Sequence, residues 1–254
     1  MAIKNVYKIF VKLCFKTTDS KHLTFKNTFF EKGYLILIFL NCLLISAQEK
    51  YPYNKWTPQE LSWAKSGNSN QFMDSSETEI LIYCNLVRVN PKLFCETYFK
   101  EYIDNNQLDI KNPYVKSLIS TLNQGKPLRI LKPDFNLYEM AKFHAKTMGE
   151  KGKAGHDGFI SRSKKFLKGK FGIIGENCSY GSYSAMEIFM SLLIDEGISD
   201  LGHRENILHK NFNAIGISIQ PHKTYGVNCV MDFGNDLVPI YEKTLKEKLL
   251  FWKH

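Results

Sequence analysis

The sequence lacks the short motifs that identify common families of hydrolases. It contains no Gly-x-Ser-x-Gly, which places a nucleophilic serine on a sharp turn, and no His-Glu-x-x-His, which places two zinc-binding histidines on one face of a helix. Internal repeats and low-complexity segments are also missing. A serine hydrolase is therefore disfavoured, and Ser179 and Ser182 are poor candidates for a nucleophile.

A concentrated basic region outside the N-terminus is missing too. The formal net charge is +9, but residues 1–47 hold seven Lys against Asp19 and Glu31, which leaves +4 for residues 48–254. In that part the Lys and Arg residues are interspersed with Asp and Glu, without a basic stripe interleaved with aromatic residues and without a nucleic-acid-binding motif. We therefore expect no nucleic-acid partner.

The sequence also has no apolar run as long as the roughly 20 residues that a bilayer-spanning helix needs. The apolar run Tyr34–Ile45 is shorter and is followed by the small residues Ser46 and Ala47 and then by polar Gln48, an order typical of a signal peptide. Residues 1–47 are thus predicted to be an atypically long signal peptide, and the protein to be secreted or periplasmic. The alternative is an uncleaved N-terminal anchor, which would then be the only contact with a membrane.

Cysteine is scarce after this leader. Residues 48–254 hold Cys84, Cys95, Cys178 and Cys229, an even number that allows three pairings. Cys84 and Cys95 lie in helical sequence, about 16 Å apart along the axis, which is too far for a disulfide. Cys178 and Cys229 fall in two strand-like stretches, and we predict that they pair. The alternative is that all four are buried free thiols.

The remaining chain divides into three parts. Residues 48–74, with scattered Pro and Gly, are predicted to be a linker or wrapping arm, residues 75–236 the folded domain, and residues 237–254 a basic C-terminal tail. A helix is predicted to begin at Ser75 or Ser76, because acidic residues follow in its first turn. The spacing of apolar residues predicts further helical segments over Phe94–Tyr102, Val115–Leu122, Leu137–Met148 and Ser184–Ile194.

The last third of the chain changes to a period of two. Apolar residues alternate over Ile215–Ile219 and again over Val227–Phe233, with a turn expected at Pro221–Thr224, and this pattern predicts a β-hairpin. Helices that precede late strands favour an α+β fold with helices packed on an antiparallel sheet.

Three short stretches carry residues that can do chemistry. They are Gly-His-Asp at 155–157, Gly-Glu-Asn at 175–177 and Gly-His-Arg-Glu-Asn-Ile-Leu at 202–208. Each places an ionisable side chain beside a glycine, which suits an exposed turn. Two imidazoles and a carboxylate, from His156, His203 and Glu176, can hold one divalent metal such as Zn²⁺ or hydrogen-bond a ligand.

The order of these stretches resembles the CAP superfamily, which includes cysteine-rich secretory proteins, antigen 5, pathogenesis-related 1 proteins and bacterial SCP-like domains. An amphipathic helix, Gly-His, Gly-Glu-Asn, a helix, Gly-His-Arg-x-Asn-Ile-Leu, Ile-Gly-Ile-Ser-Ile and Met-Asp-Phe-Gly follow one another over about residues 77–234. The resemblance implies an α/β/α sandwich with a central antiparallel sheet, secretion, and a cleft with two histidines and two acidic residues. His156, Glu176 and His203 match three of these positions.

The fourth position departs from the pattern of the eukaryotic members. They have Trp-x-x-Glu on the fourth helix, whereas this chain has Leu-Leu-Ile-Asp-Glu at 192–196. The register favours Asp195, with Glu196 as the second choice.

Several other polar residues near the motifs are expected to be structural. His144 lies on the apolar stripe of its helix, so we expect it to be buried and bonded to backbone. Arg204 and Glu205 are expected to orient the turn around His203 by salt bridging, and Asp157 to cap the next segment. Asp232 is interpreted as a strand-end residue.

Two functions remain open. The first is a secreted binding or scaffold module whose His and acidic cleft recognises a lipid, glycan, protein or divalent metal without turnover. The second is a metal-assisted hydrolase, in which a metal held by His156 and His203 activates water and Glu176 acts as the base. We favour binding, because the stretches offer no clear nucleophile.

The leader motif makes a prediction about processing. Exported protein should begin near Gln48, because Ala47 ends the short apolar run and its small flanking residues. N-terminal sequencing of protein recovered outside the cell tests this. Exported chains that retain residues before Lys32 would contradict it.

Overall fold

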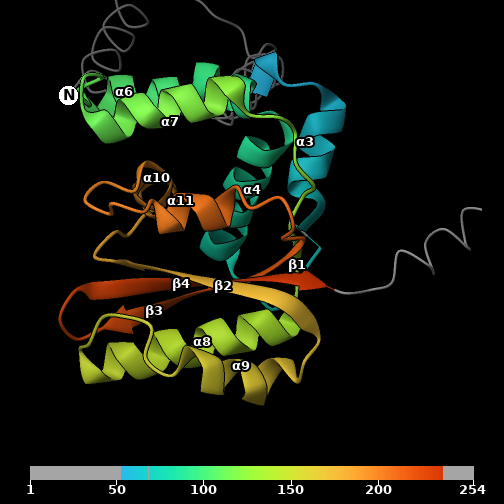
Figure 1. The fold of residues 1–254 in the computed structure, drawn as a ribbon, viewed down its shortest axis with the longest axis vertical. Helices are drawn as coiled ribbons and strands as arrows, with labels where there is room; N and C mark the ends of the chain where they lie inside the picture. The colour runs from blue at the N-terminus through green and yellow to red at the C-terminus, as the bar shows by residue number, and fades with distance from the viewer. Residues whose placement is uncertain (1–52, 68, 237–254) are drawn as a thin grey trace, which may run out of the picture. The chain divides into compact units, whose positions relative to one another are not determined.

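The computed structural model describes residues 53–67 and 69–236, which form a three-layer α/β/α sandwich (Figure 1). A four-stranded sheet lies between two helices below it and a larger group of helices above it. This arrangement and the family match given below confirm the fold class expected from the sequence. Within these residues no helix is both long and apolar enough to cross a bilayer. The expected leader (1–47) and tail (237–254) lie outside the described residues.

The elements follow the predicted order. The upper layer contains α3 (Pro58–Ala64), α4 (Ser75–Val89), α5 (Pro91–Phe94), a π-helical turn η3 (Cys95–Phe99), α6 (Lys100–Asn106), α7 (Pro113–Gln124), α10 (Ala185–Ile194) and α11 (Gly202–Ile207). The lower layer contains α8 (Phe135–Lys151) and α9 (Phe159–Leu167). The sheet contains β1 (Lys132–Pro133), β2 (Phe171–Tyr180), β3 (Ala214–His222) and β4 (Gly226–Asp236).

The sheet has the order β1-β3-β4-β2 and is antiparallel except at the short β1, which runs parallel to β3. The predicted hairpin is formed by β3 and β4, although its turn is displaced: Pro221 and His222 still pair with β4. Strand β2 pairs with β4 and has no second neighbour in the sheet, so it is an edge strand among the described residues. This edge position leaves one side of β2 open to the loops around it.

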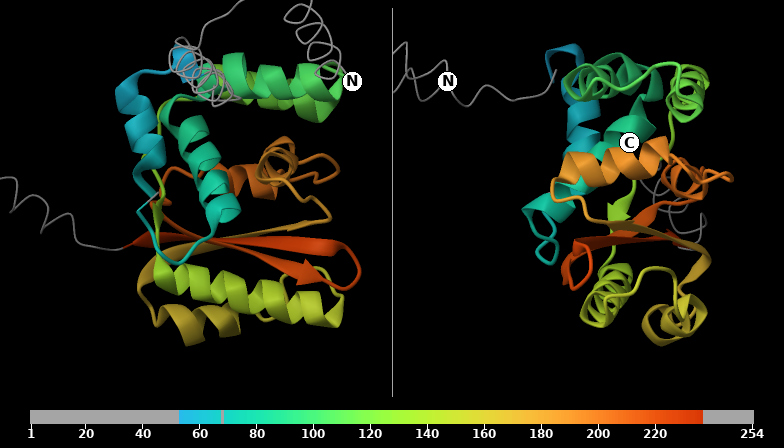
Figure 2. Two further views of the ribbon diagram at one scale, coloured as in Figure 1. Left: turned by 180° about the vertical axis from the view of Figure 1, so that it is seen from behind. Right: turned by 90° about the vertical axis from the view of Figure 1, so that its left-hand side faces the viewer.

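The two faces of the sheet differ in side-chain size. Ile215 and Ile217 of β3, with Met231 and Phe233 of β4, point into the large core shared with the upper helices. The alternate residues of these two strands point toward α8, as the two-residue repeat of a strand requires. Apart from Val230, which packs against Ala141 and Ala145, they are small or polar. Figure 2 shows α8 running along this second face.

Glycine allows α8 to lie against the sheet. A Cβ atom on Gly216 of β3 would lie 1.9 Å from the backbone nitrogen of Tyr138 in α8. A Cβ on Gly149, near the other end of α8, would lie 2.1 Å from the carbonyl oxygen of Pro221. The backbones of the helix and the hairpin are therefore in direct contact. This contact fixes the distance of α8, and of the side chains it carries, from the sheet.

A buried arginine ties the upper layer to the loop before β3. The guanidinium of Arg88 in α4 donates to the carbonyl oxygens of Ile207 and Phe212, both at 2.8 Å, and to two further carbonyls, those of Arg129 and His209. Burial lowers the pKa of Arg88 to about 10, so the group stays charged at neutral pH. Its position on α4 therefore helps to set where α11 ends and β3 begins.

The segment before α4 is packed rather than extended. Trp56 and Ala64 are buried in the main core, and Trp56 Nε1 donates to Thr97 Oγ1 at 3.3 Å. The described part of residues 48–74 therefore packs against the main core through Trp56 and Ala64. The cap of α4 is Asp74, with Glu77 completing a reciprocal capping box, one or two residues earlier than Ser75 or Ser76.

The backbone contact at Gly216 makes a prediction about stability. Gly216→Ala should lower the free energy of unfolding by about 3 kcal/mol, because α8 must move outward to admit the methyl group. Chemical denaturation measures this. Gly202→Ala is the matched control: its Cβ would meet nothing closer than 3.5 Å, and its effect should stay within about 0.5 kcal/mol. Equal stability of the two variants would show that the close contact does not exist.

Candidate functional site

The site is organised by two consecutive residues of the edge strand β2. Because side chains alternate along a strand, Glu176 points toward α8 and α9, whereas Asn177 points toward α10 and α11. Each of these residues contacts a segment that carries one of the predicted histidines. Strand β2 thus lies between the two halves of the predicted site.

Glu176 is the buried centre of the first half. Its Oε1 lies 2.8 Å from His156 Nδ1, and its Oε2 lies 2.5 Å from Arg162 Nη2. Burial alone would raise the pKa of Glu176, but the hydrogen bond from His156, the electrostatic attraction of His144, and the hydrogen bond and charge of Arg162 outweigh it and hold the pKa below its ordinary value. Glu176 is therefore ionised and acts as an acceptor for both neighbours.

His156 comes from the loop between α8 and α9. Gly155 precedes it with φ of +117°, a conformation that favours glycine, and Tyr180 Oη accepts from the Gly155 backbone N–H at 2.9 Å. The side chain of His156 is 52% exposed, while that of Glu176 is 2% exposed. The ring is thus held from below by a buried carboxylate and is open to solvent on its other side.

Asp195 is the buried acceptor of the second half. It ends α10 with φ of +60°, and its carboxylate accepts from the backbone N–H groups of His203 and Arg204 at 2.9 and 3.1 Å. It also lies 2.7 Å from His203 Nδ1. The side chain of His203 is 22% exposed and that of Asp195 is 1% exposed. The second histidine is thus held in the same way as the first.

A pair of asparagines joins the two halves. Asn177 Nδ2 donates to the carbonyl oxygen of His203 at 2.9 Å, and its Oδ1 accepts from Asn206 Nδ2 at 2.8 Å. Asn177 and Glu176 are consecutive residues of β2. A displacement of one histidine segment would therefore shift the backbone that positions the other. Gly175, which precedes Glu176 in the strand, leaves room for the side chain of Asn206, because a Cβ at this position would lie 2.7 Å from Asn206 Oδ1.

The hydrogen bonds also fix the tautomers. An ionised carboxylate can only accept, so Nδ1 of each histidine must carry the proton, and Nε2 is left with a lone pair when the ring is neutral. The same reasoning applies to His156 beside Glu176 and to His203 beside Asp195. This arrangement of carboxylate, histidine and free Nε2 is the one that supports metal-binding histidines in proteins.

Glu196 does not share this role. Its Oε1 accepts from Asn112 Nδ2 at 2.6 Å at the surface. Of the two acidic residues that the sequence left open for the fourth position, Asp195 is the one that contacts His203.

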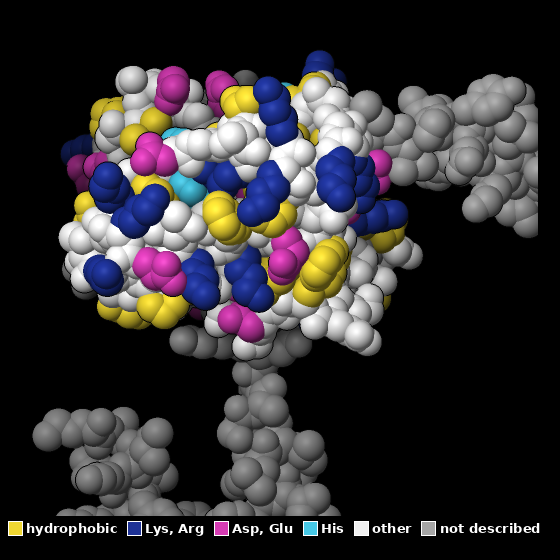
Figure 3. Space-filling model, turned by 90° about the horizontal axis from the view of Figure 1, so that it is seen from below, with side chains coloured by type: hydrophobic (Ala, Val, Ile, Leu, Met, Phe, Trp, Pro, Cys, Tyr) yellow, Lys and Arg dark blue, Asp and Glu magenta, His cyan; other side chains and the backbone are white. Residues whose placement is uncertain are grey.

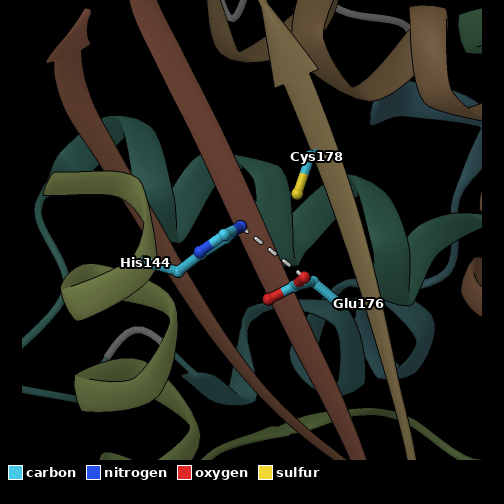
Figure 4. A group of neighbouring side chains, drawn as sticks. All are labelled: His144, Glu176 and Cys178. Carbon is cyan, nitrogen blue, oxygen red and sulfur yellow. Dashed lines mark ion pairs between the residues drawn. The ribbon is translucent and has the colours of Figure 1, made fainter. Parts of the chain in front are cut away.

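A second group of potential metal ligands lies deeper, beneath His156. His144, Glu176 and Cys178 have ligand atoms within 4.8 Å of one another (Figure 4). However, His144 Nε2 lies 2.8 Å from the Gly155 carbonyl oxygen, so this nitrogen is protonated and offers no lone pair. Burial also raises the pKa of the Cys178 thiol well above its ordinary value. We interpret this group as a hydrogen-bonded core below the site. The expectation that His144 is buried and bonded to backbone is confirmed.

Asp232 lies beside this core. It is the register partner of Glu176 across β2 and β4, and it is fully buried in the middle of β4 rather than at a strand end. Burial and the charge of Glu176 raise the pKa of Asp232 well above its ordinary value. Of the two neighbouring carboxyls, Asp232 is therefore protonated and Glu176 is ionised.

The predicted disulfide between Cys178 and Cys229 is wrong. Cys178 pairs in register with Val230, and Cys229 pairs with Ser179. The two cysteines are thus offset by one residue, and their side chains lie on opposite faces of the sheet. All four cysteines of the described chain are buried free thiols.

Two other expectations need correction. Arg204 is buried and donates to the carbonyl oxygens of Leu193 and Ile194, so it closes the end of α10 instead of forming a surface salt bridge, and Glu205 is exposed. Asp157 does not cap α9, since the capping position is Gly158 and no side chain caps it.

Arg162 and the two asparagines are the residues of the site to which the sequence assigned no role. A signal for Arg162 existed, because it shares the inward stripe of α9 with Phe159 and Phe166, where an unpaired charge would be costly. Asn177 and Asn206 stood inside the quoted motifs. The two asparagines contact each other although about 30 residues separate them in the sequence, and local periodicity does not reveal such a contact.

Fold, motif order and site geometry agree with one family. The model of the CAP family, the cysteine-rich secretory protein family, matches residues 81–233, which is more than half of the chain. This protein therefore belongs to the CAP family. A search of curated proteins found no match.

Solved structures with a similar fold come from distant organisms. An outer surface protein of Borrelia burgdorferi is 22% identical, with 51% of this chain and 96% of that chain covered and a TM-score of 0.38. The Schistosoma mansoni venom allergen-like protein 4 is 15% identical, with coverage of 65% and 90% and a TM-score of 0.41. The CAP domain of enterococcal PrgA is 15% identical, with coverage of 71% and 71% and a TM-score of 0.37. The family assignment rests on the family model.

The buried thiols make a prediction about cysteine chemistry. Burial raises the pKa of Cys84 to about 12 and those of Cys178 and Cys229 well above the ordinary value, so little reactive thiolate exists even near pH 9. Iodoacetamide should label these three thiols only after denaturation. Peptide mapping by mass spectrometry under non-reducing conditions provides the readout. A peptide linked through Cys178 and Cys229 would contradict the strand register.

Proposed function

We propose that this protein is a secreted binding module in which His156 and His203 hold a ligand or a divalent transition metal across the edge of β2. One observation carries the proposal: each ring is fixed at Nδ1 by a buried carboxylate, at 2.8 Å for Glu176 and 2.7 Å for Asp195. Two separate segments thus prepare the same donor atom, Nε2, in the same tautomer. A purely structural histidine has no need of an exposed Nε2 lone pair.

The donor set suits a borderline transition metal. Neutral imidazole nitrogens bind Zn²⁺, Cu²⁺ or Ni²⁺, and the buried carboxylates raise the basicity of the rings and hold their orientation. His156 and His203 would be the protein ligands, with Glu176 and Asp195 behind them. Since two nitrogen ligands leave coordination positions to solvent, binding in the micromolar range (about 10⁻⁶ M) is expected. The same two lone pairs would accept hydrogen bonds from a ligand in the absence of metal.

The contacts of Glu176 favour binding over hydrolysis. A general base needs a carboxylate oxygen within reach of the water that it activates. Both oxygens of Glu176 are already bonded, one to His156 and one to Arg162, and the side chain is 2% exposed. Its low pKa further weakens it as a base. Glu176 is therefore better suited to positioning His156 than to the role of base that the hydrolase hypothesis gave it.

Export of the module is part of the proposal. Residues 34–48 have the order of a short apolar run, small residues and a polar start that a signal peptide requires. The family description as secretory is consistent with that order. Nothing in the folded domain demands a reducing compartment or an oxidising one.

Zinc titration tests the metal-binding form of the proposal. Isothermal calorimetry should give binding in the micromolar range, about 10⁻⁶ M, for the wild type and at least tenfold weaker binding for His156→Ala and for His203→Ala. Affinity should also fall on acidification, because a protonated imidazole has no lone pair for the metal. If the two alanine variants bind Zn²⁺ as well as the wild type does, the metal-binding form of the proposal is wrong.

Two adjacent carboxylates provide the matched control. Asp195→Asn and Glu196→Gln each replace one acid by its amide, but only Asp195 contacts His203. Zinc affinity should fall about tenfold or more in the first variant, as expected when the acceptor behind a metal-binding histidine is lost, and should not change in the second. Equal affinities in both would show that the carboxylate behind the ring has no role.

A further inference from the structure

The outer surface of α8 and α9 combines positive charge with exposed apolar side chains. Figure 3 views the molecule from this side and shows Lys and Arg side chains spread across it, with hydrophobic side chains between them. We call the exposed residues of these two helices the basic face.

Charge is strongly divided between this layer and the rest of the domain. Residues 135–173 hold eight Lys and one Arg against three Asp and Glu, a net charge of +6. The other described residues, 53–67, 69–134 and 174–236, hold thirteen Lys and Arg against seventeen Asp and Glu, a net charge of −4. The linear sequence hides this division, because the basic residues are spaced along two helices and the segments that follow them, which the fold then places together.

The apolar side chains lie among these lysines. Ile160 of α9 is 60% exposed, and Phe143 of α8 is 42% exposed. Lys165 of α9 has its Nζ 4.5 Å from the ring centroid of Phe143 and 4.9 Å from that of Phe166, so one lysine spans the outer surfaces of both helices. The outer surfaces of α8 and α9 are therefore connected through Lys165, which lies over the exposed ring of Phe143.

We propose that the basic face binds an anionic lipid bilayer. Lysines at such a surface attract the negative headgroups, and their long side chains let Ile160 and Phe143 reach the acyl boundary below the phosphates. This mode of binding lies on the opposite side of the sheet from α10 and α11 and does not depend on the proposed function of the histidines. It also differs from an anchor formed by the leader, because it uses the folded domain.

The composition of the face favours a bilayer over a polyanionic chain. All of its exposed cations are lysines, since the one arginine, Arg162, is buried against Glu176. Arginine is the residue that recognises individual phosphates with two parallel hydrogen bonds, whereas lysine acts as a point charge suited to a diffuse negative surface. A polyanion in water also offers no apolar environment for the exposed aliphatic side chain of Ile160, whereas the acyl region of a bilayer does.

Vesicle co-sedimentation of the full chain tests the proposal. Because residues 1–47 are themselves basic, the effect is measured as a difference between variants of equal charge. Lys142→Gln/Lys146→Gln/Lys164→Gln removes three charges from the face, and Lys111→Gln/Lys116→Gln/Lys126→Gln removes three exposed charges from α7 and its flanks, above the sheet. With vesicles of phosphatidylcholine and about 30% phosphatidylglycerol, the first triple should weaken binding roughly 100-fold at low salt, at about fivefold per lysine, and the second far less.

A single apolar substitution separates the bilayer from other polyanions. Ile160→Ser should weaken vesicle binding about tenfold without lowering the melting temperature, since the side chain is 60% exposed and contributes little to the core. Heparin and duplex DNA are the comparison ligands, and Ile160→Ser should not alter their binding. Equal losses in the two lysine triples would overturn the proposal. So would an unchanged vesicle affinity of Ile160→Ser together with tight heparin or DNA binding that only the first triple weakens, which would assign the face to a polyanion.

Discussion

The two-residue repeat of β2 is the constraint on which the whole site depends. Because consecutive side chains of a strand point to opposite faces, Glu176 and Asn177 can each hold one histidine segment while sharing a single stretch of backbone. A shift of one residue in the pairing of β2 with β4 would exchange the two faces and undo both contacts. The long pairing of β2 with β4, from Ile174 to Tyr180, prevents such a shift.

Burial of charge is the main energetic cost of this arrangement, and the surrounding groups offset it. Glu176 would not stay ionised in the interior without Arg162 and His156, and removal of one partner of such a buried pair costs about 3–5 kcal/mol. Asp232, across the strand, accommodates the same charge by keeping its own proton. In the upper layer, Arg88 and Arg204 instead donate to carbonyl oxygens at helix ends and in loops. Buried cations there serve to fix the chain between elements.

Much of the architecture could be predicted because it depends on local pattern. The spacing of apolar residues located α8 and α10, and the alternation in the last third located β3 and β4. The three motifs also led to the histidines and to Glu176. The register between strands could not be read in the same way, since alternation tells which residues share a face within one strand but not which residue of the next strand lies opposite. The offset of Cys178 from Cys229 and the partnership of Asp232 with Glu176 both depend on that register.

The four unpaired cysteines of the described chain have a consequence for where the domain can fold. Each thiol fills space in a core that is already complete without a covalent cross-link. The described structure therefore contains no disulfide whose formation it would depend on. The cysteine content of this core therefore carries no information about the compartment in which the domain works.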